Sequence, residues 1–198
     1  MWCLLLVSKD KKLIAVPGDL LEKIYAVSAK EGKTPFLYIN EIFEQALRAH
    51  DMGKSLRQVI DAYIMIETVK NAGSTIISSE SLHAIIQKIY ENSTDELKKK
   101  WLETGGWYGK YILAKFGELK NPEELKNLLE AYLWDMNEIH LVRLDGKLLL
   151  RCISPHQPIE LTELSASFLE GVMSALGYKC IRKDIVKGVI LMEFKSIE

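Results

Sequence analysis

The change in hydrophobic periodicity near residue 135 is the feature that most constrains how this chain can fold. Before it, apolar residues recur at helical spacing. After it, residues 138–144 (EIHLVRL) and 147–153 (KLLLRCI) follow the two-residue period of β-strands. Asp145 and Gly146 separate these two runs, and an Asp-Gly pair is a strong signal for a two-residue hairpin. The sequence therefore predicts a helical part followed by an antiparallel hairpin.

The alternation of helix and hairpin continues to the end of the sequence. Residues 160–177 have the apolar stripe of a helix, and Gly177 stands where such a helix would stop. Residues 178–184 and 188–194 are predicted to form a closing pair of strands. Helices followed by hairpin, helix and hairpin predict an α+β fold in which helices pack on an antiparallel sheet.

Three helices with clear end signals are expected in the first third of the chain. The first ends at Gly32, and the second begins at Thr34 with a proline in its first turn. Ser55 and Gln58 have the spacing of a capping box at the start of the third helix. Residues 71–80, which are small and polar, are the best candidate for a linker.

More helices are expected between this linker and the first hairpin. A helix from Thr94 is predicted to break at Gly105 and Gly106 and then to resume, and Asn121 followed by proline is typical of a further helix start. Gly105, Gly106 and Gly109 are interpreted as positions of close helix packing. They lack the strand-then-loop context that a nucleotide-binding loop needs.

The order strand, proline, helix, glycine and capped helix in residues 11–52 resembles the ribbon-helix-helix family of DNA-binding proteins. In that family one strand from each of two subunits pairs into a ribbon that lies in the major groove of DNA. The resemblance implies a homodimer that binds double-stranded DNA. Its DNA-facing positions here are Lys11, Leu13, Ala15, Lys33 and Thr34.

The part from about residue 80 onward resembles the 4-vinyl-reductase-like domain, which is related to haem-NO-binding proteins and binds small molecules. GGWYG at 105–109, the Asp-Gly hairpin, residues 168–180 and residues 184–194 carry this resemblance. It implies a pocket between helices and sheet for a small hydrophobic or aromatic ligand. The aromatic residues that could line the pocket, or else belong to the core, are Trp107, Tyr108, Tyr111, Trp134 and Phe168.

Some members of that family hold zinc through acidic and thiolate side chains, and the corresponding positions differ here. They are occupied by Ile181, Asp184 and Met192, with Leu164 near the position of a further cysteine. An isoleucine cannot ligate a metal, and a thioether is a poor zinc donor. We therefore expect no metal site and no cofactor.

No catalytic constellation is found in the sequence. The four histidines have no partners at metal-binding or triad spacing, and no Gly-Lys-Ser/Thr loop, GxSxG or HExxH motif occurs. Lys98–Lys100 is interpreted as a solvated helix face. The sequence thus favours a binding protein over an enzyme.

Composition and charge narrow the class of protein. The chain has 198 residues, is 48% hydrophobic and 27% charged, and carries a net charge of −1, so its charge as a whole gives no argument for nucleic acid. Its three cysteines are scattered, and the opening MWCLLLV is too short to span a membrane and lacks a signal-peptide pattern. We expect a cytoplasmic protein without a membrane partner.

Together these observations predict two functional parts and a connection. Residues 1–53 form a ribbon-helix-helix-like dimerisation and DNA-binding module, residues 54–78 a connecting helix and linker, and residues 79–198 a ligand-binding domain. The implied function is that of a dimeric transcriptional regulator that senses an effector. The alternative is a dimeric ligand-binding or protein-interaction adaptor that does not bind DNA.

Overall fold

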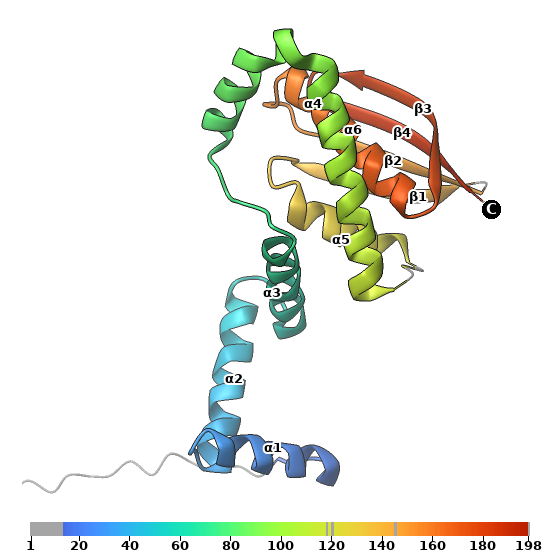
Figure 1. The fold of residues 1–198 in the computed structure, drawn as a ribbon. Coiled ribbons are helices and arrows are strands. Elements are labelled where there is room, and N and C mark those ends of the chain that lie inside the picture. The colour runs from blue at the N-terminus through green and yellow to red at the C-terminus, as the bar shows by residue number, and fades with distance from the viewer. Residues whose placement is uncertain (1–13, 118, 120, 145, 198) are drawn as a thin grey trace, which may run out of the picture. The chain divides into compact units, whose positions relative to one another are not determined.

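The structure is a computed structural model that describes residues 14–117, 119, 121–144 and 146–197 (Figure 1). Its internal contacts divide the chain into two compact units, and the division falls between Ile60 and Asp61. This boundary lies within helix α3 (Leu56–Asn71). The second half of that helix therefore belongs to the C-terminal unit, although the sequence places it in a connector.

The N-terminal unit contains α1 (Gly18–Lys30), α2 (Pro35–Asp51) and the start of α3. Gly32, at a φ of 67°, lies between α1 and α2, and Thr34 Oγ1 then accepts a hydrogen bond from the backbone N–H of Leu37 at 3.3 Å. Ser55 and Gln58 exchange two hydrogen bonds, at 2.8 and 3.2 Å, at the start of α3. These helix ends are as the sequence predicts, because each depends on residues close together in the chain.

The ribbon strand predicted for this unit lies mostly outside the described residues, which begin at Ile14. Residues 14–17 precede α1 without forming a strand. The ribbon therefore stays a prediction.

The C-terminal unit combines a layer of helices with one antiparallel sheet, which confirms the predicted α+β class. The strands have the order β1-β2-β4-β3 and are all antiparallel. Helices α5 and α6 lie against one face of the sheet, and α4 packs on α6 (Figure 1). The elements are α4 (Ser79–Phe116), α5 (Pro122–Tyr132), β1 (Glu138–Leu144), β2 (Lys147–Ile153), α6 (Ile159–Ala175), β3 (Tyr178–Val186) and β4 (Val189–Ser196).

The first hairpin has the two-residue connection that the sequence predicts. Leu144 pairs with Lys147, and Gly146 has a φ of 74°, which a residue without a side chain adopts most easily. Along β2 the side chains of Leu148, Leu150 and Cys152 alternate inward and join the core with residues of α5 and α6. One face of the sheet is thus buried under the helices.

Helix α4 passes through Gly105 and Gly106 without a break, so the predicted break is wrong. Its departure from helical geometry comes earlier, at Ser93 (φ −143°, ψ 25°). The glycines remain helical because α6 lies directly against them. A Cβ at Gly105 would stand 2.0 Å from the carbonyl oxygen of Phe168, and one at Gly171 would stand 2.1 Å from that of Leu102. The close packing predicted for Gly105 and Gly109 is confirmed, whereas a Cβ at Gly106 would meet its nearest atom at 3.9 Å, an ordinary contact distance.

Among the described residues, no helix is both long enough and apolar enough to cross a membrane.

Candidate ligand-binding cleft

A cleft of about 230 Å³ opens between the second part of α4, the end of α5 and α6. The α6 residues Ser165 and Phe168 are 4% and 2% exposed and form its floor. Trp101 and Tyr132 form walls, and Lys100 is an exposed residue at the rim. The complete lining is Lys100, Trp101, Thr104, Tyr132, Leu133, Ser165 and Phe168.

The aromatic wall of the cleft is tied to the core. The rings of Tyr132 and Phe168 stack at a centroid distance of 4.5 Å and an interplanar angle of 4°. Tyr108 packs beside them, 4.5 Å from Tyr132 and 5.9 Å from Phe168. Burial raises the pKa of both tyrosines above the usual value, which keeps their hydroxyls neutral. The wall therefore offers a firm, apolar surface.

A buried polar chain lies behind the floor. Gln157, which is 1% exposed, donates from Nε2 to a carboxylate oxygen of Asp135 at 2.5 Å and to Ser165 Oγ at 3.4 Å. An ionised carboxylate only accepts hydrogen bonds, so Asp135 fixes which side of the amide faces it. The Gln157 amide group therefore acts as a donor toward Ser165.

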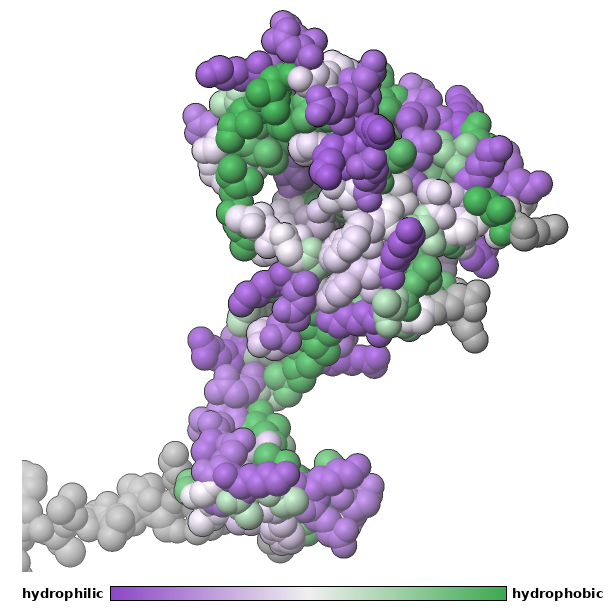
Figure 2. All heavy atoms as spheres, viewed as in Figure 1, coloured by the Kyte–Doolittle hydropathy of each residue, from purple (hydrophilic) through white to green (hydrophobic). Residues whose placement is uncertain are grey.

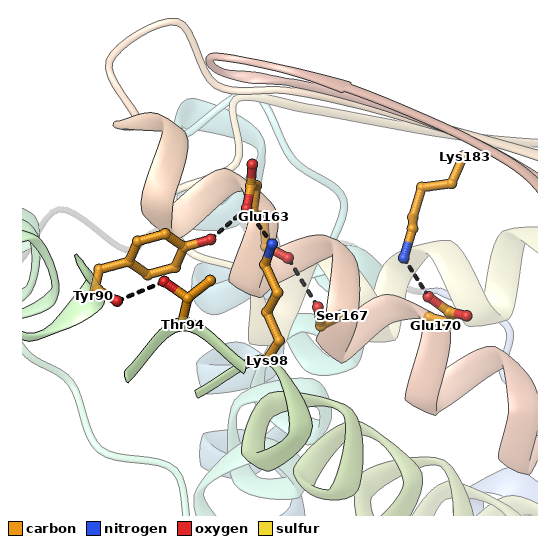
Figure 3. Close-up of polar contacts among 7 residues, drawn as sticks. All are labelled: Tyr90, Thr94, Lys98, Glu163, Ser167, Glu170 and Lys183. Carbon is orange, nitrogen blue, oxygen red and sulfur yellow. Dashed lines mark hydrogen bonds and ion pairs between the residues drawn. The ribbon is translucent and has the colours of Figure 1, made fainter. Parts of the chain in front are cut away.

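Ion pairs hold the helices around this cleft (Figure 3). Lys98 Nζ lies 2.5 Å from a carboxylate oxygen of Glu163, to which the hydroxyl of Tyr90 also donates. Hydrogen bonds from Lys98 and Tyr90 lower the pKa of Glu163. On the other side of α6, Lys183 of β3 binds Glu170 at 2.7 Å. Helix α6 is thereby joined to α4 and to the sheet.

The three lysines predicted as one solvated face have three different surroundings. Lys98 binds Glu163, whereas Lys100 lines the cleft described above. Lys99 does not line that cleft, but it lines a shallow groove with Ile89 and Glu103, and Lys100 also borders this groove. Helical geometry explains the difference, because consecutive residues on a helix point about 100° apart.

The five aromatic residues predicted to line a ligand pocket do not lie in one place. Phe168 lines the cleft, and Tyr108 lies beside it in the core. Trp107 and Tyr111 stack on each other, with ring centroids 5.5 Å apart. Trp134 lines another cleft. The structure thus groups these residues in two pairs and one single residue, and both members of the pair at the cleft, Tyr108 and Phe168, belong to the core.

The cleft that contains Trp134 lies within the C-terminal unit and has a volume of about 550 Å³. The end of α3, the linker after it and the turn after α5 form its walls, which include Ile66, Ile76 and Ile77. Those three isoleucines are 46%, 78% and 48% exposed. This second cleft is therefore wide and open, and its apolar residues face water.

The residues predicted to contact DNA are only partly described. Lys11 and Leu13 lie outside the described residues, and Ala15 is exposed ahead of α1. The ammonium of Lys33 binds Glu41 at 2.6 Å and Glu31 at 2.9 Å. Hydrogen bonds to Glu41 and Glu31 raise the pKa of Lys33. This lysine is thus paired within the unit.

The positions that correspond to zinc ligands in the resembled family lie partly on the neighbouring strands β3 and β4. Asp184 pairs across the sheet with Leu191, while Met192 is buried and pairs with Lys183. Leu164 lies in the interior, at 0% exposure. In the described part of the chain, no three His, Cys, Asp or Glu side chains form a group that could hold a metal ion.

Sequence reasoning missed most of the cleft. Gln157 stands in a loop motif, SPHQP, and gives no local sign that it is buried. One signal was present, since Ser165 interrupts an otherwise apolar helix stripe. A serine at a buried helix position needs a hydrogen-bond partner for its hydroxyl, and in the structure that partner is Gln157.

Comparison with known proteins gives little more. No protein-family model and no curated protein sequence matches the chain significantly. One solved structure, described as "Probing the function of heme distortion in the H-NOX family", matches with a TM-score of 0.39 and 11% identity. The match covers 72% of this chain and 89% of that one. A likeness this distant assigns neither a family nor a function.

Proposed function

We propose that the chain is a dimeric regulator whose N-terminal unit joins two copies and binds double-stranded DNA, and whose C-terminal unit binds an effector. The observation that supports this proposal is that α1 and α2 leave most of their apolar side chains exposed. In α1 and α2 only Ser28 and Ala49 are buried. Large apolar side chains on these helices are exposed instead, namely Leu20, Tyr25, Val27, Leu37, Phe43 and Leu47.

These exposed side chains favour a second copy as their cover. Leu37 and Leu47 are 57% and 65% exposed, and Figure 2 shows hydrophobic residues among hydrophilic ones on the surface of these helices. An amphipathic helix gains stability only when its apolar stripe is covered. The C-terminal unit differs, because it already encloses a large core of its own. The N-terminal unit is thus the part that needs a partner.

Dimerisation would also supply what the predicted ribbon requires. Two copies place two strands side by side, and the helix start at Thr34 offers free backbone N–H groups to a phosphate. An effector in the C-terminal unit would then act by favouring one arrangement of the two DNA-contacting parts over another. DNA affinity would change with effector concentration.

DNA binding is tested by fluorescence polarisation with labelled duplexes at about 50 and about 200 mM salt. We expect the affinity for DNA to fall steeply as the salt concentration rises. In Lys11→Gln, the slope of log affinity against log salt concentration should be smaller by about one for each phosphate contact that the substitution removes. Lys99→Gln, which removes an exposed lysine from α4, is the matched control and should leave the slope unchanged.

The second candidate is the adaptor that does not bind DNA. It is favoured by the pairing of Lys33 with two carboxylates and by the net charge of −1. If the dimer forms but no duplex binds even at the lower salt, the regulator proposal fails and the adaptor remains.

A further inference from the structure

We propose that the cleft between α4, α5 and α6 binds a small aromatic carboxylate, whose ring lies against Trp101, Tyr132 and Phe168 and whose carboxylate meets Ser165 and Lys100. This inference rests on the proposed effector-binding role of the C-terminal unit and names the ligand class. Three features carry it: a hydroxyl fixed as a donor, a lysine without an ionic partner, and an aromatic wall of limited size.

The hydroxyl of Ser165 is set to donate into the cleft. Asp135 turns the Gln157 amide so that its Nε2 points at Ser165 Oγ, which therefore accepts. Among the described residues the Ser165 hydroxyl donates its own proton to no acceptor, whereas Ser167 on the same helix donates to the carbonyl of Glu163 at 3.0 Å. Because Ser165 is 4% exposed and lines the cleft, a ligand oxygen is the natural acceptor for this proton.

Lys100 adds positive charge at the mouth of the same cleft. Within the described part of the chain its ammonium has no carboxylate partner, whereas Lys98, half a turn away, is bound to Glu163. A hydroxyl donor beneath and an ammonium at the rim suit an anion with two oxygens better than a neutral alcohol. The charge pattern therefore selects a carboxylate.

The volume and lining of the cleft determine the size and the apolar character of the rest of the ligand. An apolar cavity of about 150 Å³ holds a benzene molecule, so the cleft volume of about 230 Å³ suits one ring with a short substituent. The stacked rings of Tyr132 and Phe168, together with Trp101, offer flat apolar contacts. The second cleft differs, because its lining is largely aliphatic and includes the carboxylate of Asp135, which would repel an anion.

The test is isothermal titration of benzoate and of benzyl alcohol, its neutral analogue, into the full chain. We expect benzoate to bind, and to bind about tenfold more tightly than benzyl alcohol. Ser165→Ala should weaken benzoate by about tenfold, and Lys100→Gln should remove most of the preference for benzoate over benzyl alcohol. Lys99→Gln, one residue away and outside the cleft, should change neither affinity.

Three results would overturn the inference: no heat with benzoate at millimolar concentration, equal affinity for both probes, or an unchanged affinity in Ser165→Ala and Lys100→Gln. Lys100 is exposed, so its variant keeps the test valid if Ser165→Ala fails to fold. The outcome is separable from the proposed function. DNA binding without benzoate binding rejects this ligand class alone, and benzoate binding without DNA binding rejects the regulator alone.

Discussion

At the scale of single residues, Glu163 is the point where two parts of α4 meet α6. It accepts a hydrogen bond from Tyr90, which precedes the kink at Ser93, and pairs with Lys98, which follows it. Because Lys98 and Tyr90 stabilise the charged form, the pKa of Glu163 lies below its ordinary value of 4.5. The carboxylate therefore links pH to the stability of this contact.

We expect Glu163→Gln to lower the free energy of unfolding by about 1 kcal/mol near neutral pH, since the pair is partly solvated. A carboxyl with a depressed folded-state pKa contributes stability above its unfolded pKa and loses it as pH falls through the folded value. The difference between wild type and variant should therefore shrink as pH falls below 4.5 and vanish below the folded-state pKa of Glu163. Urea unfolding at several pH values measures it.

The control for this prediction is Glu103→Gln, which changes an exposed carboxylate on α4 that has no ion pair in the described structure. Its effect should be small and nearly independent of pH. A loss of stability in Glu163→Gln that is the same at acid and neutral pH would show that the side chain acts through packing and not through its charge.

At the scale of elements, the contact between α4 and α6 depends on glycines, which have no side chain. Backbone atoms of the two helices approach so closely at Gly105 and Gly171 that a Cβ would overlap a carbonyl oxygen. Gly106 differs, because the nearest atom to its Cβ would lie at 3.9 Å, an ordinary contact distance. Two neighbouring glycines on one helix thus have opposite tolerance for a methyl group.

We expect Gly105→Ala to destabilise the C-terminal unit by about 1 to 3 kcal/mol or more, since the helices would have to separate. Gly106→Ala should be neutral or stabilising by up to about 1 kcal/mol, because alanine favours the helix. The urea midpoints of the two variants provide the measurement. Equal midpoints would mean that the helices are not held at this distance in solution.

The elements also show how far sequence reasoning reaches. The capping residues Thr34, Ser55 and Asn121 were predicted because their partners lie two or three residues away. The break expected at Gly105 was wrong because glycine lowers helix propensity, and packing by a helix more than 60 residues further along the chain outweighs that cost. Likewise, Ser165 and Asp135 meet through Gln157, and this pairing depends on the fold as a whole.

At the scale of the whole molecule, the two units differ in how far they bury their apolar side chains. The C-terminal unit has a continuous core that includes residues of all its strands and helices. The N-terminal helices have apolar side chains that one copy leaves in water. Exposed apolar patches of this kind mark interaction sites in many proteins, which supports the proposed dimer.

We expect light scattering after gel filtration to give twice the chain mass of 22.6 kDa. Phe43→Asp places a charge on the apolar stripe of α2 and should shift the mass toward the monomer. Gln45→Glu adds a charge at an exposed position two residues away and should leave the dimer intact. A wild-type chain that stays monomeric at high micromolar concentration would rule out both the dimer and the ribbon.

The glycine contact has a mechanical consequence. The part of α4 after Ser93 is in close backbone contact with α6, so this part and α6 must move as one body. In the described structure, the part before Ser93 touches α6 only through side chains, namely the packing of Ile86 on Leu161 and the hydrogen bond from Tyr90 to Glu163. Ser93 is therefore the natural hinge. Ligand binding in the cleft would therefore move the linker at residues 72–78 by rotating the part of α4 before Ser93. It would not shift the whole helix.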